Sequence, residues 1–340
     1  MSDSRALRPI VILGPTAGGK SELAVGLAER LPEGGEVLGA DSMQVYRQLD
    51  AGTAKPEPAL RARVPHHLID IVEPTERFTV ADWVARADAL IVELQQRGRR
   101  PIVVGGTNLY LKVLLEGMFD APAQDPAFRA SLEQAPTDEL HRRLGRVDPA
   151  AAERIHANDR KRIVRALEVH HVTGRPISDQ QRQWFDQGAE GPRGQGAKEV
   201  GYRHDPVLIG LDWPAEAINR RINQRVKRMF FPSREDASDR GDATESLPEE
   251  VRRLEAAGVL GAQAREALGY KQMLAHLHGR CTLEEAFEQT KIQTRRFARQ
   301  QRTWLRRFRG VHWLPAAELE EGALVESGLA AVRQAEKDVR

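Results

Sequence analysis

A glycine-rich segment near the N-terminus has the residue types and the spacing that bind phosphate. It reads Gly14-Pro15-Thr16-Ala17-Gly18-Gly19-Lys20-Ser21 and matches the P-loop pattern GxxxxGK[ST]. An apolar run precedes it and a helical pattern follows it, as a P-loop requires, although an ordinary glycine-rich turn would fit the same place. Backbone N–H groups at such a helix start bind polyanions. Lys20 would add a positive charge, and the Ser21 hydroxyl would be a ligand for Mg²⁺.

Two other segments directly follow predicted strands. Asp41 comes after the second strand candidate, and Gly105-Gly106-Thr107 follows the third. In open α/β sheets, ligands bind beyond the carboxyl ends of the strands. From its position alone, Asp41 could be a general base, a metal ligand or a helix N-cap. The two glycines would let the backbone approach a ligand and Thr107 would supply a hydroxyl, but a Gly-Gly turn capped by Thr is an equally good explanation.

Basic residues gather on three predicted helices. Arg221 and Arg225 lie four residues apart on an amphipathic helix over residues 215–230, so both could reach one phosphate site. A second helix begins at Asn158 or Asp159, ends at Gly174 and has basic residues in its first turns, where the helix dipole disfavours cations. An anionic partner such as RNA would relieve that arrangement; a solvated basic face is the alternative.

The third basic helix is predicted over residues 291–309, which contain no acidic residue. One stripe of this helix is expected to pack on the core and the other to face outward. The aromatic stripe is Phe297, Trp304 and Phe308, and the basic stripe is Arg295, Arg299, Arg302 and Arg306. A stripe of one charge sign is typical of a nucleic-acid-binding surface, whereas a solvated face usually mixes signs.

The elements that would position these residues indicate an α/β fold. Strands are predicted at residues 10–13, 36–39, 101–104 and 207–211, with helical patterns between them, which favours a parallel sheet with helices on both faces. We expect a first part of this core over 1–119, an all-helical insertion over 120–198 and a second part over 199–315. A C-terminal tail over 316–340 should be peripheral. Residues 187–196 read as a linker, and residues 232–246 as a polar loop.

Composition narrows the class of protein. The chain has 340 residues, enough for a large core, and a net charge of only +2, so any affinity for nucleic acid must come from clustered charge. Cys281 is the single cysteine, which excludes a disulfide framework and a cysteine-rich zinc site. The N-terminus lacks a signal-peptide pattern, and no apolar run is long enough to span a membrane. We therefore expect a cytoplasmic protein that does not contact membranes.

Taken in order, these motifs resemble one family, the tRNA dimethylallyltransferases of bacterial type. The matching segments span nearly the whole chain: GPTAGGKS, DSMQVY from Asp41, AGTAKP, PHHLID, VGGTNLYLKVLLEG, DPAAAERIHANDRKRIVRALEV, RINQRVKRM, ALGYKQM and TRRFARQQRTWLRRF. The resemblance implies a P-loop NTPase-like core and an insertion that grips the tRNA anticodon stem-loop. It implies transfer of a dimethylallyl group from dimethylallyl diphosphate to the N6 amine of adenosine 37, in tRNAs reading codons that begin with U. It also implies that the P-loop holds diphosphate rather than ATP.

The resemblance also assigns roles to residues. Asp41 matches the general base, Thr107 a residue near the bridging oxygen of the leaving group, and Arg225 a diphosphate ligand beside the P-loop; Arg221 is a weaker candidate. Mg²⁺ would bridge the diphosphate oxygens with Ser21 as its protein ligand. Segments that match tRNA contacts include Asp41, Ser42, Met43, Gln44, Thr107, Arg129, Lys161, Arg162, Ile163, Val164, Arg165, Arg295, Arg299 and Arg302. The protein is expected to be a monomer.

Two rival activities share parts of this pattern. An adenylate dimethylallyltransferase would need neither the helical insertion nor the basic helix, and a P-loop nucleotide kinase would bind ATP. A nucleic-acid-binding protein without catalysis would not need Lys20, Asp41, Thr107 and Arg225 together. One departure from the family is an apparently acidic, serine-rich insertion over residues 231–248, which should lie at the surface.

Overall fold

The structure is a computed structural model that describes residues 7–118, 122, 124–181, 201–233 and 245–338. The chain forms two compact units, Met1–Leu115 with Gly201–Arg340, and Glu116–Val200. We call them the core unit and the helical unit. The predicted linker at 187–196 lies outside the described residues, as does most of the polar loop predicted at 232–246.

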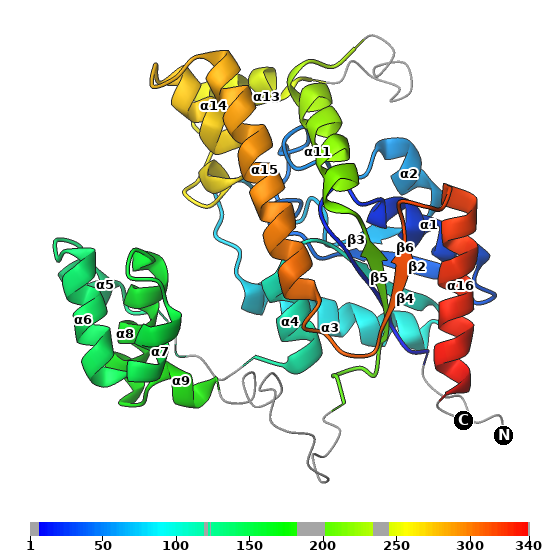
Figure 1. Cartoon of the computed structure of the whole chain (residues 1–340), viewed down its shortest axis with the longest axis horizontal. Coiled ribbons are helices and arrows are strands. Elements are labelled where there is room, and N and C mark those ends of the chain that lie inside the picture. The colour runs from blue at the N-terminus through cyan, green and yellow to red at the C-terminus, as the bar shows by residue number, and fades with distance from the viewer. Residues whose placement is uncertain (1–6, 119–121, 123, 182–200, 234–244, 339–340) are drawn as a thin grey trace. The chain divides into compact units, whose positions relative to one another are not determined.

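The core unit is built on a six-stranded parallel sheet (Figure 1). The strands are β1 (Ile10–Leu13), β2 (Gly35–Gly39), β3 (His66–His67), β4 (Arg100–Val104), β5 (Val207–Asp212) and β6 (Val311–Pro315). Their order across the sheet is β3-β2-β4-β1-β5-β6, so the apolar strands β1 and β4 lie in the middle. The prediction of a parallel α/β core is confirmed. The edge strands β3 and β6 are not predicted, because one has two residues and the other mixes polar with apolar side chains.

Helices flank the sheet and extend from it. In the core unit they are α1 (Lys20–Arg30), α2 (Pro58–Arg63), α3 (Val80–Gln96), α4 (Asn108–Glu116), α11 (Ala215–Phe230), α13 (Leu247–Ala256), a 3-10 turn (Ala264–Glu266), α14 (Tyr270–Leu277), α15 (Leu283–Leu305) and α16 (Glu321–Lys337). Capping boxes begin α3 at Thr79 and α15 at Thr282. Helices α11 and α15 lie side by side (Figure 1).

The C-terminal residues are not the peripheral tail that the sequence suggests. Helix α16 buries Leu324, Val325, Leu329 and Val332. It packs so closely on α1 that a Cβ added at Gly26 would lie 2.5 Å from Val325. Removing α16 would therefore expose core surface of the sheet layer.

The helical unit contains only helices among its described residues. They are α5 (Pro126–Ser131), α6 (Thr137–Val147), α7 (Pro149–Arg154), α8 (Arg160–Thr173) and α9 (Ile177–Gln180). Asp159 caps α8 through the Arg162 N–H, and Gly174 ends it in the left-handed conformation at φ 68°, as predicted. Leu140, Leu144 and Ile163 are central to a separate apolar core. Within the described parts of the chain, no helix is long and apolar enough to cross a membrane.

Candidate active site

The P-loop joins β1 to α1, with Gly19 as the last residue before the helix. Its φ of 81° is a conformation that favours glycine. Lys20, the first helical residue, reaches back so that Nζ donates to the Pro15 carbonyl oxygen at 2.8 Å. Burial, and then the positive charge of Arg225, lower the pKa of Lys20 to about 8. A partly buried ammonium group held by a neutral oxygen is suited to an incoming anion.

Arg225 comes from α11 and meets the P-loop at its third residue. Its Nη1 donates to Thr16 Oγ1 at 2.9 Å, and burial lowers its pKa. Arg221, one turn earlier, donates from Nε to the Ala17 carbonyl oxygen at 2.7 Å and lies 4.8 Å above the Trp213 ring. The structure thus brings Arg225 to the P-loop as predicted, while Arg221 supports the loop backbone.

Asp41 begins a turn directly beyond β2. Its Oδ1 accepts from the Met43 N–H at 2.9 Å and from the Gln44 N–H at 3.3 Å. Both loop hydrogen bonds fall on Oδ1, so Oδ2 is the oxygen that can take a proton. Thr107 holds the same turn, because its Oγ1 accepts from the Ser42 N–H at 2.9 Å.

Hydrogen bonds connect these three segments. Arg225 donates to Thr16 of the P-loop, and the buried amide of Gln301 joins Thr16 to Gly106. The next residue, Thr107, holds the turn that begins at Asp41. The charge of Asp41 acts on both Lys20 and Arg225 and opposes the lowering of their pKa values. Neither cation forms an ion pair with a carboxylate in the described part of the chain. A bound polyanion would offset the charge of these two cations and would leave a carboxylate beside it able to accept a proton.

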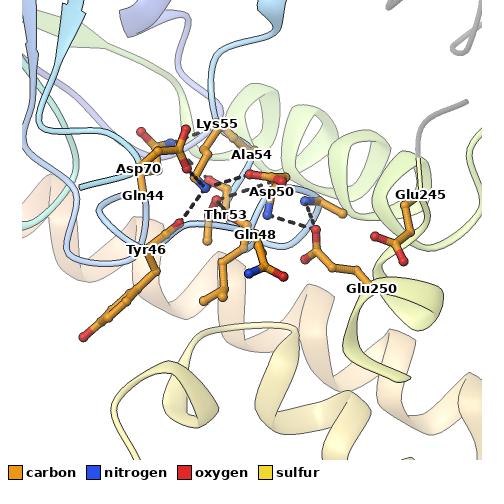
Figure 2. Close-up of polar contacts among 12 residues, drawn as sticks. Gln44, Tyr46, Gln48, Asp50, Thr53, Ala54, Lys55, Asp70, Glu245 and Glu250 are labelled. Atoms are coloured by element: carbon orange, nitrogen blue, oxygen red, sulfur yellow. Dashed lines mark hydrogen bonds and ion pairs between the residues drawn. The ribbon is translucent and has the colours of Figure 1, made fainter. Parts of the chain in front are cut away.

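Gln44 is held by the loop over residues 49–55, which Figure 2 shows in close-up. Its Nε2 donates to the carbonyl oxygens of Thr53 and Ala54, both at 3.1 Å. Both amide protons are used in this way, so Oε1 is the remaining polar atom of this side chain. If Gln44 contacts RNA through its side chain, it does so as an acceptor.

The 49–55 loop is itself fixed from two sides (Figure 2). Lys55, whose side chain is 5 % exposed, donates to the Tyr46 carbonyl oxygen, Asp50 and Asp70 at 2.6, 2.7 and 2.5 Å. On the other side, buried Glu250 of α13 accepts from two backbone N–H groups, those of Asp50 and Ala51, each at 2.9 Å. Burial raises the pKa of Glu250. These contacts give the predicted Ser42-Met43-Gln44 segment a rigid support.

Sequence reasoning missed Gln301 of α15, which is fully buried. Its amide joins the P-loop to the Gly105-Gly106-Thr107 segment. The sequence does contain an indication of this role. Gln301 lies at helical spacing from the apolar residues Ala298 and Leu305, which places its amide on the buried face of the helix.

The predicted aromatic stripe is confirmed only in part. Phe308 is buried, just beyond the end of α15, but Phe297 is 37 % exposed. The helix itself buries Ala286, Thr290, Thr294, Ala298, Gln301 and Leu305. Three of the four predicted arginines line a groove of about 350 Å³ between α15 and α11, while Arg306 lies beyond the end of α15 and outside the groove. Its walls include Arg295, Arg299 and Arg302 together with Ile218, Asn219 and Ile292. The groove is therefore basic with an apolar floor.

In the helical unit, the predicted RNA contacts divide into paired and exposed residues. Arg129 donates to both oxygens of Glu168, at 2.7 and 2.8 Å, and Arg165 donates to the same carboxylate at 2.5 Å. Burial would raise the pKa of Glu168, but these hydrogen bonds outweigh it and lower the pKa to about 2. Arg162 is far more exposed, with Asp159 at 3.4 Å.

Ile163 corrects the sequence prediction. Its side chain is fully buried in the core of the helical unit, and Val164 packs against that core. An RNA contact by the Ile163 side chain is therefore wrong; the α-helical period turns it away from the exposed Lys161 and Arg162.

The predicted Mg²⁺ would need oxygen ligands close to the P-loop. No group of three or more His, Cys, Asp or Glu side chains in the described residues could hold a metal ion. The Ser21 hydroxyl, at the end of the P-loop motif and in the first turn of α1, is a hard oxygen of the type that Mg²⁺ prefers. These residues fit a magnesium ion that keeps most of its ligands from water and diphosphate, with one from the protein.

The sheet, the P-loop after β1 and the acid beyond β2 define an α/β enzyme that acts on a phosphorylated substrate. The family model described as IPP transferase matches residues 44–308. A tRNA dimethylallyltransferase of Geobacter sulfurreducens is 46% identical over 310 residues, which cover 90% of this chain and 91% of that protein. One from Geobacillus kaustophilus is 41% identical over 92% of this chain and 93% of its own. The chain therefore belongs to the IPP transferase family and is a prenyl-transferring enzyme.

Solved structures agree with this assignment. The full-length tRNA isopentenylpyrophosphate transferase of Bacillus halodurans superposes with a TM-score of 0.65 at 33% identity, covering 97% of this chain and 98% of that one. A eukaryotic dimethylallyltransferase acting on tRNA gives a TM-score of 0.69 at 27% identity, covering 91% of this chain and 74% of its own. These relatives do not favour the adenylate-transferring or kinase alternatives.

Proposed function

We propose that the protein transfers the dimethylallyl group of dimethylallyl diphosphate to the N6 amine of adenosine 37 in tRNAs that read codons beginning with U. The observation that supports this most directly is the chain of hydrogen bonds that joins Arg225 and the P-loop at Thr16 to the turn that begins at Asp41. It would place a proton acceptor beside a diphosphate site. The names of the relatives supply the acceptor RNA. We further infer that the enzyme acts as a cytoplasmic monomer.

In the proposed reaction, the N6 nitrogen attacks the allylic carbon bonded to oxygen. The C–N bond forms, the C–O bond breaks, and its electron pair leaves with diphosphate. The surplus proton of the amine passes to Asp41 Oδ2, since Oδ1 is held by the turn. The products are N6-dimethylallyladenosine and diphosphate.

The leaving group would be stabilised by preorganised donors. Lys20, Arg225 and the N–H groups at the start of α1 would bind the diphosphate as its charge grows. The Thr107 hydroxyl, whose bond to Ser42 Oγ is long at 3.3 Å, would turn toward the bridging oxygen. Mg²⁺ held at Ser21 would neutralise part of the diphosphate charge.

The proposed RNA partner is the anticodon stem-loop. The target base must leave its stack to reach Asp41, and Ser42, Met43 and Gln44 would contact it and its neighbours. The exposed Lys161 and Arg162 and the basic groove of Arg295, Arg299 and Arg302 would bind backbone phosphate.

The test uses purified protein, Mg²⁺, radiolabelled dimethylallyl diphosphate and unmodified tRNA with adenosines at positions 36 to 38. AMP is the alternative acceptor. We expect label on adenosine 37 and a loss of about 10²–10⁴-fold in kcat for Asp41→Asn. That variant keeps an oxygen for the Met43 and Gln44 N–H groups and removes the basicity together with the negative charge of the side chain. Label on AMP instead, or transfer to neither acceptor, would contradict the proposal.

A further inference from the structure

The Gln301 side chain makes one hydrogen bond to each of two active-site loops. Its Oε1 accepts from the Thr16 N–H at 2.9 Å, and its Nε2 donates to the Gly106 carbonyl oxygen at 2.7 Å. The Thr16 N–H can only donate and the Gly106 carbonyl can only accept, so the orientation of the amide is fixed by its partners. Burial of a primary amide costs little free energy when both its oxygen and its nitrogen are hydrogen-bonded, whereas loss of either hydrogen bond leaves a buried polar group without a partner.

Each of these loops continues directly to a group of the proposed reaction. On one side, the Thr16 hydroxyl accepts from Arg225. On the other, Gly106 precedes Thr107, whose hydroxyl binds Ser42 next to Asp41. A shift of Gln301 would therefore change the distance between the diphosphate ligands and the proposed base.

Gly106, on the second loop, leaves space for the Gln301 amide because it has no side chain. A Cβ added at Gly106 would lie 2.4 Å from Gln301 Nε2, so only glycine allows the amide to approach its carbonyl oxygen. Its neighbour Gly105 is equally close to the residue that follows β2, because a Cβ there would lie 2.1 Å from the Ala40 carbonyl oxygen. The loop is thus tightly placed between β2 and α15.

We propose that Gln301 is a positioning residue that sets the separation of the diphosphate-binding loop from the Asp41 and Thr107 segments. It touches no reacting atom and acts through Thr16 and Gly106. The role rests on the proposed function, since it concerns the alignment of the leaving group with the accepting amine. Alignment errors of about 1 Å can cost about 100-fold in rate.

The test compares Gln301→Glu with a matched control, Gln263→Glu, in the full chain. Gln263 also bridges a backbone N–H and a carbonyl oxygen, both of Phe78, at 3.3 and 2.9 Å. In either variant, one carboxylate oxygen replaces the donor that faced a carbonyl oxygen. Gln263→Glu should lose less thermal stability, because Gln263 is half-buried and Gln301 is fully buried, so activities are compared at a temperature at which both variants are folded.

We expect kcat to fall about 100-fold in Gln301→Glu and to stay within about twofold of wild type in Gln263→Glu. The KM for tRNA should not change in either. Binding of inorganic pyrophosphate with Mg²⁺, measured by calorimetry without tRNA, should weaken about tenfold only in Gln301→Glu. Gln301→Met, an apolar side chain of similar length, is the second variant if Glu prevents folding, and it should show the same losses.

Equal losses of kcat in the Gln301 and Gln263 variants would overturn the proposal, as would full activity of Gln301→Met. The pyrophosphate measurement separates this inference from the proposed function. If the wild-type protein modifies no tRNA, the proposed function fails, while weaker pyrophosphate binding in Gln301→Glu would still support the positioning of the loop.

Discussion

Two groups of basic side chains in this protein have opposite surroundings. In the helical unit, Arg129 and Arg165 both bind the buried carboxylate of Glu168. In the core unit, the hydrogen bonds of Lys20 and Arg225 to other described residues go to neutral oxygens, those of Pro15 and Thr16. The first arrangement lowers the pKa of Glu168 to about 2, and the second lowers the pKa of Lys20 to about 8.

This comparison distinguishes cations that stabilise the fold from cations that are available to bind an anionic ligand. The Glu168 carboxylate already binds both Arg129 and Arg165, so removing its charge should cost stability. Burial of Lys20 and Arg225 without such a partner opposes folding and favours binding of diphosphate. The same residue types therefore serve different purposes in the two units, and each purpose can be tested by removing charge.

The largest effect is expected for Arg225→Gln. Glutamine can still donate to Thr16 Oγ1, but it brings no charge to the diphosphate. We expect kcat/KM for dimethylallyl diphosphate to fall about 10²–10³-fold while the melting temperature stays the same or rises. Steady-state kinetics and calorimetric melting check this. A large loss of stability would show that Arg225 belongs with the structural cations.

Glu168→Gln tests the structural role of the paired arginines in the helical unit. It leaves two arginines without their counter-charge, so the free energy needed to open α8 should fall by about 2 kcal/mol. This loss is smaller than that expected for a fully buried ion pair, because the Arg129 side chain is 36 % exposed. Hydrogen exchange of the α8 amides measures this, and exposed Glu139→Gln is the control. A lower KM for tRNA in Glu168→Gln would show that Arg129 and Arg165 are RNA contacts whose charge Glu168 normally offsets, rather than residues that stabilise the fold.

The pH dependence of activity should report the pKa of Lys20. As pH rises through about 8, the ammonium of the free enzyme loses its proton and its attraction for diphosphate. We expect kcat/KM for dimethylallyl diphosphate to fall about tenfold per pH unit above this value. The alkaline limb of kcat should lie at higher pH, because bound diphosphate favours the charged form. Lys20→Arg should lack the limb near pH 8; an unchanged limb would assign it to another group.

The smallest effect is expected for Lys55→Met in the support of Gln44. Loss of its three hydrogen bonds should loosen the 49–55 loop, raise the KM for tRNA about fivefold and leave pyrophosphate binding unchanged. Lys55→Arg should recover part of the affinity, and Lys271→Met, which breaks an exposed pair with Glu266, should change nothing. Weaker pyrophosphate binding in Lys55→Met would show that the two regions are not independent.

Much of the core could be predicted because its signals are local. The P-loop spacing, the central strands and helix α11 each depend on a few neighbouring residues, and they lie where the sequence placed them. The edge strands β3 and β6 and the packing of α16 depend on partners far along the chain. Their sequences, one of two residues and one partly polar, carry little periodicity of their own.

For the site, the sequence alone determined which residues could do chemistry: Lys20, Asp41, Thr107 and Arg225. Only the tertiary structure decided which cations already have carboxylate partners, that Ile163 is a core residue, and that Gln44 presents only an acceptor. It also brought Gln301 to Thr16, across 285 residues of chain. Hydrogen bonds between such distant residues produce no recognisable pattern in the sequence, because the fold alone brings the two residues close together in space.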